Sequence, residues 1–392
     1  MANAVTAPAP PAYWQGLRVA VNAVCLWRPL TGIGQYALNL AREWAREGLL
    51  LPQYFYGASW SPVAEPRTAP GLGAFKHIFK RLVPSPYETV RAVRQRAFDL
   101  IPGPFDVYLE PNFVPFRFEG PIVLTVHDLS HVRHPETHPA ERVRILSEWL
   151  PPAMERAAHI LTVSEFQRRE IMDVFGIDGG RVTACHNGVG AEFRPRPEPE
   201  CAAVLQRHGL RYRGYALVVG TLEPRKNLIA ALDAYAQLPD SMRRRCPLVV
   251  AGMHGWKTGS FAPRLRTLAR SGSVQPLGFV DDAELPFLYA GARVFLYPSL
   301  YEGFGLPALE AMASGVPVIA SNLSCMPEVV GAAGRLVDPR DPAAIRRAIE
   351  ELHDDAQAWA RCAQQGLERA RDFTWARTAA ATATVLARAA GR

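Results

Sequence analysis

Short runs of consecutive apolar residues alternate along the chain with longer stretches in which apolar residues recur at helical spacing. Continuous Val, Ile and Leu runs between helical patterns are typical of parallel strands that are covered on both faces of a sheet. The pattern therefore predicts an α/β protein. The predicted strands are 17–24, 121–128, 159–164, 215–220, 247–252, 293–299 and 316–321.

Turn residues predict where two helices and one domain boundary lie. The segment TGIGQYALNLAREWAREG has a glycine-bearing turn and predicts a helix ending at Gly48. Asp341 followed by Pro342 is a typical helix start, with Asp as the cap and Pro in the first turn. The charged, proline-rich segment 193–200 predicts a stiff, exposed linker, so we expect one doubly wound unit on each side of it.

Composition narrows the class of protein without choosing a function. The chain has 392 residues, of which 48% are hydrophobic and 21% charged, as in soluble globular proteins. We expect no transmembrane helix and no signal peptide, and the Ala- and Pro-rich residues 1–15 predict a disordered tail. Six scattered cysteines without a CxxC pair favour a reducing cytosol. The net charge of +7 is compatible with nucleic acid, an anionic membrane or phosphorylated ligands.

Two glutamates lie around a glycine-rich loop in the segment YEGFGLPALEAMASGVPVIAS, residues 301–321. The segment predicts a strand end, a loop, a buried helix over 307–314 and a stop at Gly315. Carboxylates such as Glu302 and Glu310 accept hydrogen bonds from vicinal sugar hydroxyls, while loop amides at a helix start suit a phosphate. Together these groups describe a sugar nucleotide. The alternative is that Glu310 pairs with an internal arginine and that Glu302 is solvated.

A pair of cations follows another predicted strand. Arg225 and Lys226 come after the glycine turn that ends the strand 215–220, just before a helix that starts at Asn227. Two cations at the carboxyl end of a strand can neutralise a diphosphate. A solvated Arg–Lys pair is the alternative, but the cations lie in the same half of the chain as the glutamate loop, which favours the functional interpretation.

The segment HDLSHVRHPETH contains four histidines, at positions 127, 131, 134 and 138. On one helix they would share a face and suggest zinc, but Pro135 and Pro139 break such a helix, so we expect no metal site. We expect the last three to be surface or capping histidines. His127 differs because it ends a buried strand next to Asp128, facing a cleft.

Residues 71–100 mix basic and apolar side chains at helical spacing around two prolines. This pattern fits a solvated helix face. It also fits a patch that contacts a membrane surface or an acidic acceptor, with the basic stretch 76–96 as the candidate.

The segments GTLEPRKN (220–227) and SLYEGFGLPALEAMASGVPVIAS (299–321) resemble the retaining glycosyltransferases of family 4, which have the GT-B fold. Two glutamates with seven residues between them are the hallmark of that family. Further similar segments are TGIGQY (31–36), the His127–Asp128 pair, TVSEFQRR (162–169), HNGV (186–189) and FTWART (373–378). The resemblance therefore covers nearly the whole chain.

The resemblance implies roles for the matching residues. Glu302 and the amides after it would contact the transferred sugar, Glu310 would hold the nucleotide ribose, and Arg225 with Lys226 would bind the diphosphate. The residues implied at the reacting centre are His127, Asp128, Glu302, Arg225 and Lys226. Those implied to contact the donor are Gly32, Ile33, Gly34, Thr221, Arg225, Lys226, Phe279, Val280, Glu302, Gly303, Phe304, Gly305, Leu306 and Glu310. Among these, Gly32 and Gly34 would let their loop approach the phosphates, and residues 278–280 would lie near the base. Thr221 stands where many members have Arg, so one phosphate cation is missing or supplied elsewhere.

The resemblance also implies an architecture of two Rossmann-like domains facing across a cleft. Residues 16–195 would bind the acceptor, residues 196–372 would bind the nucleotide sugar, and residues 373–392 would form a helix that packs back on the first domain. The implied acceptor is a saccharide or lipid-linked glycan, and no cofactor, metal or nucleic acid is implied. The protein would be cytoplasmic, with peripheral association with the anionic membrane at the inner face of the plasma membrane.

The segments 28–41 and 127–131 look most like mannosyltransferases of bacterial surface polysaccharide assembly, which use GDP-mannose. A UDP-sugar-dependent enzyme, a sugar-nucleotide epimerase and a non-catalytic partner subunit that binds the nucleotide sugar remain alternatives. A glycosidase, whose two carboxylates act as acid and nucleophile or base, would leave Arg225 and Lys226 without a task.

Overall fold

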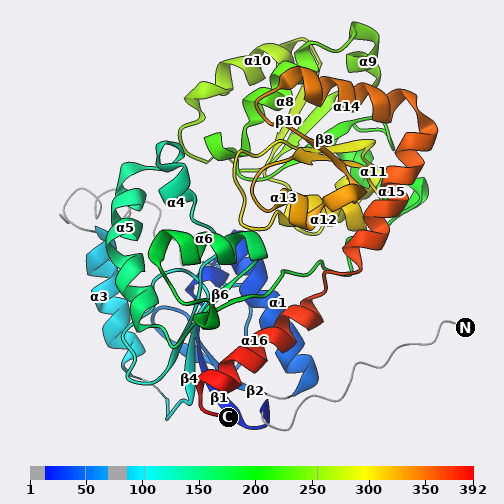
Figure 1. The fold of residues 1–392 in the computed structure, drawn as a ribbon. Coiled ribbons are helices and arrows are strands. Elements are labelled where there is room, and N and C mark those ends of the chain that lie inside the picture. The colour runs from blue at the N-terminus through cyan, green and yellow to red at the C-terminus, as the bar shows by residue number, and fades with distance from the viewer. Residues whose placement is uncertain (1–13, 49, 69–85, 101, 254) are drawn as a thin grey trace, which may run out of the picture.

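The computed structural model describes residues 14–48, 50–68, 86–100, 102–253 and 255–392, which form two stacked lobes (Figure 1). Each lobe is built around one sheet. Residues 1–13 of the predicted tail and residues 76–85 of the basic stretch lie outside the described residues, while Trp14 is buried against the core of the first lobe.

The first sheet has the strand order β3-β2-β1-β4-β5-β6-β7 and is parallel except for the antiparallel pair β2–β3. Its strands are β1 (Leu17–Asn22), β2 (Leu50–Phe55), β3 (Trp60–Ser61), β4 (Val107–Glu110), β5 (Ile122–Thr125), β6 (His159–Thr162) and β7 (Val182–Ala184). The helices of this lobe are α1 (Gly32–Glu47), α3 (Pro86–Phe98), α4 (Ser130–Arg133), α5 (Ala140–Arg156) and α6 (Glu165–Phe175).

The second sheet is parallel throughout, with the order β10-β9-β8-β11-β12-β13. Its strands are β8 (Ala216–Val219), β9 (Leu248–Ala251), β10 (Val274–Gly278), β11 (Val294–Tyr297), β12 (Val318–Ser321) and β13 (Arg335–Val337). The helices that follow the linker are α7 (Glu198–Arg207), α8 (Leu228–Ala236), α9 (Asp240–Arg245), α10 (Ala262–Arg270), α11 (Leu285–Gly291), α12 (Leu306–Ala313), α13 (Met326–Val329), α14 (Pro342–Asp354) and α15 (Ala356–Ala370).

Helices cover both faces of the second sheet because its strands are apolar on both sides. Leu217 and Val249 belong to one core, which includes residues of α11 and α12, whereas their neighbours Val218 and Val250 belong to another, which includes residues of α8 and α14. Successive side chains of a strand point to opposite faces, so a continuous apolar run needs two covering layers. The structure thus confirms the predicted α/β fold with two doubly wound sheets.

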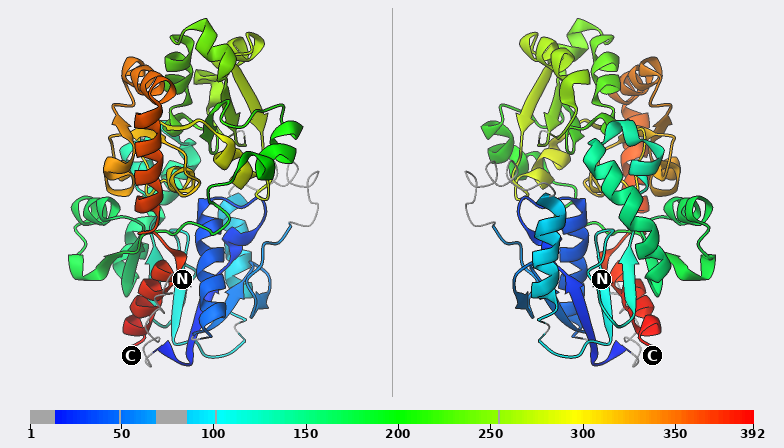
Figure 2. Two further views of the ribbon diagram at one scale, coloured as in Figure 1. Left: turned by 90° about the vertical axis from the view of Figure 1, so that its right-hand side faces the viewer. Right: turned by 90° about the vertical axis from the view of Figure 1, so that its left-hand side faces the viewer.

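The last helix, α16 (Trp375–Ala389), leaves the second lobe and packs on the first (Figures 1 and 2). The Trp44 indole on α1 donates a hydrogen bond to the Ala379 carbonyl over 3.1 Å. Where the chain returns, Thr374 forms a β-bridge with Val189 of the outgoing segment. The predicted return of the C-terminal helix is therefore confirmed, whereas the boundary at 195/196 stays a prediction.

The predicted helix ends also occur. α1 ends at Gly48, which adopts the left-handed conformation with φ 65°. Asp341 caps α14 by accepting hydrogen bonds from the backbone amides of Ala343 and Ala344. Gly315 follows α12 with φ 73°. No helix in the described part of the chain has the length and apolar character that crossing a membrane requires.

Candidate active site

Glu302 lies between the two predicted cations. The loop after β11 brings its Oε2 to 2.9 Å from the Arg225 guanidinium, and its Oε1 to 2.6 Å from the Lys226 Nζ. Lys226 also donates to the Tyr297 hydroxyl over 2.6 Å, and Arg225 pairs with Glu223 over 2.7 Å. The structure thus brings together the glutamate loop and the Arg–Lys pair that the sequence places far apart.

Electrostatics keep Glu302 ionised although it is buried. Burial opposes ionisation, but Arg225 and Lys226 outweigh it and lower the pKa of Glu302 to about 2. Burial also opposes the charge on Arg225, whose pKa is nevertheless raised well above its usual range by Glu302 and other carboxylates. Both Glu302 oxygens already accept charge-assisted hydrogen bonds, so this carboxylate is a poor base and a poor nucleophile.

The His127–Asp128 pair of the first lobe directly faces this loop. A Cβ atom on Gly303 would lie 2.0 Å from the His127 carbonyl oxygen and 3.2 Å from the Asp128 Cβ, so only glycine allows this approach. Burial raises the energy of the Asp128 charge, but Arg225 and Ser130 outweigh it and lower its pKa to about 2. Arg225 therefore interacts with carboxylates of both lobes.

His127 is held as a neutral imidazole. Its Nε2 lies 2.8 Å from the Pro111 carbonyl, which can only accept, so Nε2 carries the proton and Nδ1 remains an acceptor. Burial lowers the pKa of His127. The Tyr36 ring packs edge-on at 5.0 Å between centroids and fixes the imidazole further.

The glycine loop that starts α1 lies opposite the start of α12. A Cβ on Gly32 would lie 3.9 Å from a Leu306 methyl group, so two helix N-termini meet here, a favourable place for an anion. Gly34 has a different reason to be glycine, because a Cβ there would lie 2.7 Å from the Cys25 carbonyl oxygen. Ile33 packs against an apolar cluster of the first lobe.

The remaining predicted residues differ in how their side chains could serve a ligand. Phe279 is 57% exposed beyond β10, whereas Val280 is buried in the core. Phe304 packs on Phe373 with centroids 5.6 Å apart, and Gly305 is left-handed with φ 96°. Thr221 provides no cation. Gly255 packs closely against it in space, because a Cβ atom on Gly255 would lie 2.9 Å from the methyl group of Thr221.

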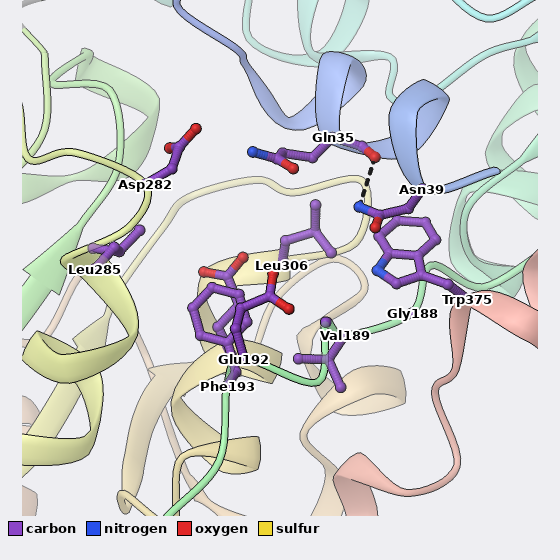
Figure 3. Close-up of a pocket in the computed structure, with 12 residues that line it drawn as sticks. Gln35, Asn39, Gly188, Val189, Glu192, Phe193, Asp282, Leu285, Leu306 and Trp375 are labelled. Carbon is purple, nitrogen blue, oxygen red and sulfur yellow. Dashed lines mark hydrogen bonds between the residues drawn. The ribbon is translucent and has the colours of Figure 1, made fainter. Parts of the chain in front are cut away.

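Glu310 lines an open pocket of about 460 Å³ between the lobes (Figure 3). Glu192 and Asp282 add two more carboxylates, and neither Lys nor Arg is among the described residues that line the pocket. Burial raises the pKa of Glu310 to about 7, with Glu192 and Asp282 acting in the same direction and the Tyr289 hydroxyl opposing them. The other lining residues are Gln35, Asn39, Gly188, Val189, Gly190, Phe193, Leu285, Leu306 and Trp375.

Sequence reasoning missed most of this pocket. Its residues come from α1, the segment 188–193, Asp282 in the loop before α11, the start of α11, α12 and α16, so no local motif joins them. Gln35 and Asn39 carry the one usable signal, because they lie one turn apart on a helix that follows the glycine loop (Figure 3).

The interpretation of the later histidines was partly wrong. His131 and His138 are buried, not at the surface, with 2% and 3% exposure. His138 Nε2 lies 2.9 Å from the Ser130 hydroxyl, which donates to Asp128. The described residues contain no group of three or more His, Cys, Asp or Glu side chains arranged to hold a metal ion.

Two facing lobes with parallel sheets, joined by a linker and a returning C-terminal helix, define the GT-B class of glycosyltransferases. The chain belongs to this class and to glycosyltransferase family 4: residues 30–193 match the model of Glycosyltransferase Family 4, and residues 209–369 match that of Glycosyl transferases group 1. It is 41% identical over 359 residues to O-antigen chain mannosyltransferase B of Escherichia coli, covering 88% of this chain and 93% of that protein.

Solved structures agree on the fold. Sucrose-phosphate synthase from Thermosynechococcus elongatus superposes with a TM-score of 0.74 at 20% identity, covering 94% of this chain and 98% of that one. Anabaena HepE in complex with UDP and glucose superposes with a TM-score of 0.70 at 18% identity, covering 95% of this chain and 99% of that one. The chain is thus a glycosyltransferase with the GT-B fold.

Proposed function

We propose that this enzyme transfers mannose from GDP-mannose, with retention of configuration, onto a saccharide or lipid-linked glycan in polysaccharide assembly. The relative in Escherichia coli is named an O-antigen chain mannosyltransferase, and the similarity extends over nearly the whole of both chains. The single observation that carries the proposal is the contact of Glu302 with Arg225 and Lys226. This contact supports the proposal because a carboxylate that could accept hydrogen bonds from sugar hydroxyls lies beside two cations suited to a diphosphate.

In the proposed reaction, the bond between the sugar C1 and the diphosphate breaks, and its electron pair leaves with GDP. Arg225, Lys226 and the amides at the starts of α1 and α12 stabilise the growing negative charge, which is the kind of term that contributes most to such catalysis. An acceptor hydroxyl forms the new bond to C1 and gives its proton to a phosphate oxygen of the leaving GDP. Glu302 and the neutral His127 orient the sugar.

A carboxylate nucleophile, as in glycosidases, fits this site poorly. The low pKa of Glu302 and its two cationic partners make it weakly nucleophilic. A non-catalytic subunit is also disfavoured, because binding of the nucleotide sugar alone does not require His127 and Asp128 of the first lobe to face the glutamate loop.

The acidic pocket beside Glu310 favours guanine over uracil. Guanine presents two adjacent donors, N1–H and the N2 amino group, which one carboxylate can accept together. Uracil presents one N–H between two carbonyl oxygens, which carboxylates repel. Glu192 and Asp282 are the candidates for reading the base, while Glu310 takes the ribose. A UDP-sugar is the second candidate donor, because HepE, which has a similar fold, was solved in complex with UDP.

The test is a thermal-shift titration with GDP, UDP and ADP, followed by transfer assays with GDP-mannose and UDP-glucose. A nucleotide at 100 times its Kd stabilises the folded state by about 2.7 kcal/mol, so GDP should raise the melting temperature at the lowest concentration. Glu192→Gln or Asp282→Asn should reduce the difference in affinity between GDP and UDP. A larger shift with UDP, together with transfer from UDP-glucose alone, would refute the proposed donor.

Contact with an anionic membrane surface, at the cytoplasmic face, is part of the proposal. In α3 the exposed side chains include Tyr87, Val93 and Arg96, a mixture of apolar and basic character that is typical of interfacial helices. Sedimentation with vesicles of anionic and of neutral lipid tests this part separately.

A further inference from the structure

The residue before the sugar-binding glutamate has contacts in both lobes. Tyr301 is only 4% exposed, and its backbone carbonyl accepts a hydrogen bond from Arg225 over 2.5 Å. Its side chain leaves the second lobe and enters the first. There its hydroxyl donates to the Glu170 carboxylate, and accepts from the Gln167 amide over 2.7 Å.

The partners of this hydroxyl belong to two segments of the first lobe. Gln167 and Glu170 lie on α6, while the third partner, the Leu129 backbone amide at 3.3 Å, directly follows Asp128. Burial and the Glu170 carboxylate raise the pKa of Tyr301 well above its usual range, so the hydroxyl keeps its proton and donates it.

The surrounding contacts shield most of this network from solvent. Gln167 is fully buried, and Ser164, the residue that caps the start of α6, donates to the Gly303 carbonyl over 2.7 Å. Arg133 pairs with the second oxygen of Glu170 over 2.6 Å. Loss of the Tyr301 hydroxyl would therefore leave a buried donor and a buried acceptor without their partner, which is costly.

We propose that Tyr301 is a positioning residue that ties the sugar-binding loop to the first lobe, so that Glu302 and Arg225 are set correctly only when His127 and Asp128 lie opposite them. The hydroxyl takes no part in the chemistry. The inference rests on the proposed reaction at Glu302, and it assigns to α6 the task of aligning the two halves of that site.

The test compares Tyr301→Phe with Tyr215→Phe. Tyr215 is an equally buried tyrosine whose hydroxyl donates to the Leu288 carbonyl over 2.6 Å within the second lobe alone. Tyr301→Phe should lower kcat about tenfold or more, while GDP affinity stays within about twofold. Amide hydrogen exchange over residues 127–133 should become faster in Tyr301→Phe and stay unchanged in Tyr215→Phe.

A second variant approaches the tie from the other lobe. Glu170→Met removes the acceptor of the Tyr301 hydrogen bond. Because each variant breaks this same interaction, the double variant with Tyr301→Phe should lose no more kcat than the worse single variant. If Tyr301→Phe folds poorly, Glu170→Met alone tests the tie, because it should lower kcat and speed exchange over residues 127–133 in the same way.

Three results would overturn the proposal: kcat of Tyr301→Phe within twofold of Tyr215→Phe, losses that multiply in the double variant, or unchanged exchange over 127–133. Failure of the proposed donor is distinguishable, because it would abolish transfer from GDP-mannose in the unmodified enzyme while leaving the exchange comparison intact.

Discussion

Replacing Lys226 by methionine removes one of the two cations beside Glu302 and keeps the length of the side chain. Lys226 is 17% exposed, and its ammonium donates to Glu302 and to Tyr297, each over 2.6 Å. If it also receives the leaving diphosphate, it acts as a fixed donor in a site with little water. Loss of one such donor costs about 2.7–4 kcal/mol of transition-state stabilisation, which is about 10²–10³ in kcat.

The free energy of unfolding should fall only moderately in this variant. Glu302 keeps its contact with Arg225 in the variant, so no buried carboxylate is left unpaired. We therefore expect less than the about 3–5 kcal/mol that breaking a fully buried ion pair costs. The assay measures kcat and KM for transfer from GDP-mannose, with a melting curve for each variant.

Arg335→Ala is the matched control, because it removes one positive charge from the same lobe. Arg335 pairs with Glu351 over 2.7 Å, with side chains that are 30% and 44% exposed, so solvent screens the pair. Its kcat/KM should stay within about twofold of the unmodified enzyme. If Lys226→Met matched this control within threefold, Lys226 would not stabilise the leaving group.

The site leads to four further predictions. Turnover should survive EDTA, because Arg225 and Lys226 supply the positive charge that a metal would; activity restored only by Mg²⁺ would contradict this. GDP affinity should rise as the pH increases from 6 to 8, because Glu310, with a pKa of about 7, becomes a better acceptor when it ionises. Calorimetry should show that GDP affinity depends less on pH in Glu310→Gln. The same pH dependence in both proteins would exclude the ribose contact. Because this pKa is raised from 4.5, Glu310 should also destabilise the unliganded fold as the pH rises from 4.5 to 7, since the unfolded chain ionises first. Gly303→Ala should lower kcat at least about tenfold, because its Cβ would lie 2.0 Å from the His127 carbonyl oxygen. The control Gly259→Ala, whose Cβ meets no atom within 4 Å, should leave kcat unchanged. Equal kcat values for the two variants would show that the lobes need not approach this closely.

The strands predicted from the sequence form uninterrupted, mainly apolar runs, whereas the missed strands are interrupted by polar residues or proline, or are very short. β4 contains Tyr108 and Glu110, and β2 contains Pro52, which obscured the apolar run. β7 and β13 have three residues each and owe their strand conformation to a neighbouring strand. Such strands depend on tertiary pairing, which local patterns do not contain.

The candidate site divides in the same way. Arg225, Lys226 and Glu302 were predicted because each lies in a local motif at a strand end, and the fold brings those ends together. Glu192 was missed because only the return of α16 and the position of α1 make its surroundings a pocket. The buried His131 and His138 were misjudged because packing between elements, not the local sequence, decides their exposure.

The polypeptide passes between the lobes twice, and the two passages lie side by side. Val189 forms a β-bridge with Thr374, and a Cβ atom on Gly188 would lie 2.0 Å from the Trp375 backbone nitrogen. The two connecting segments therefore cannot slide past each other. A double connection of this kind resists twisting and permits bending about a single axis. Opening of the enzyme for product release should therefore follow one hinge direction, and a side chain at position 188 should force the two passages apart and loosen that hinge.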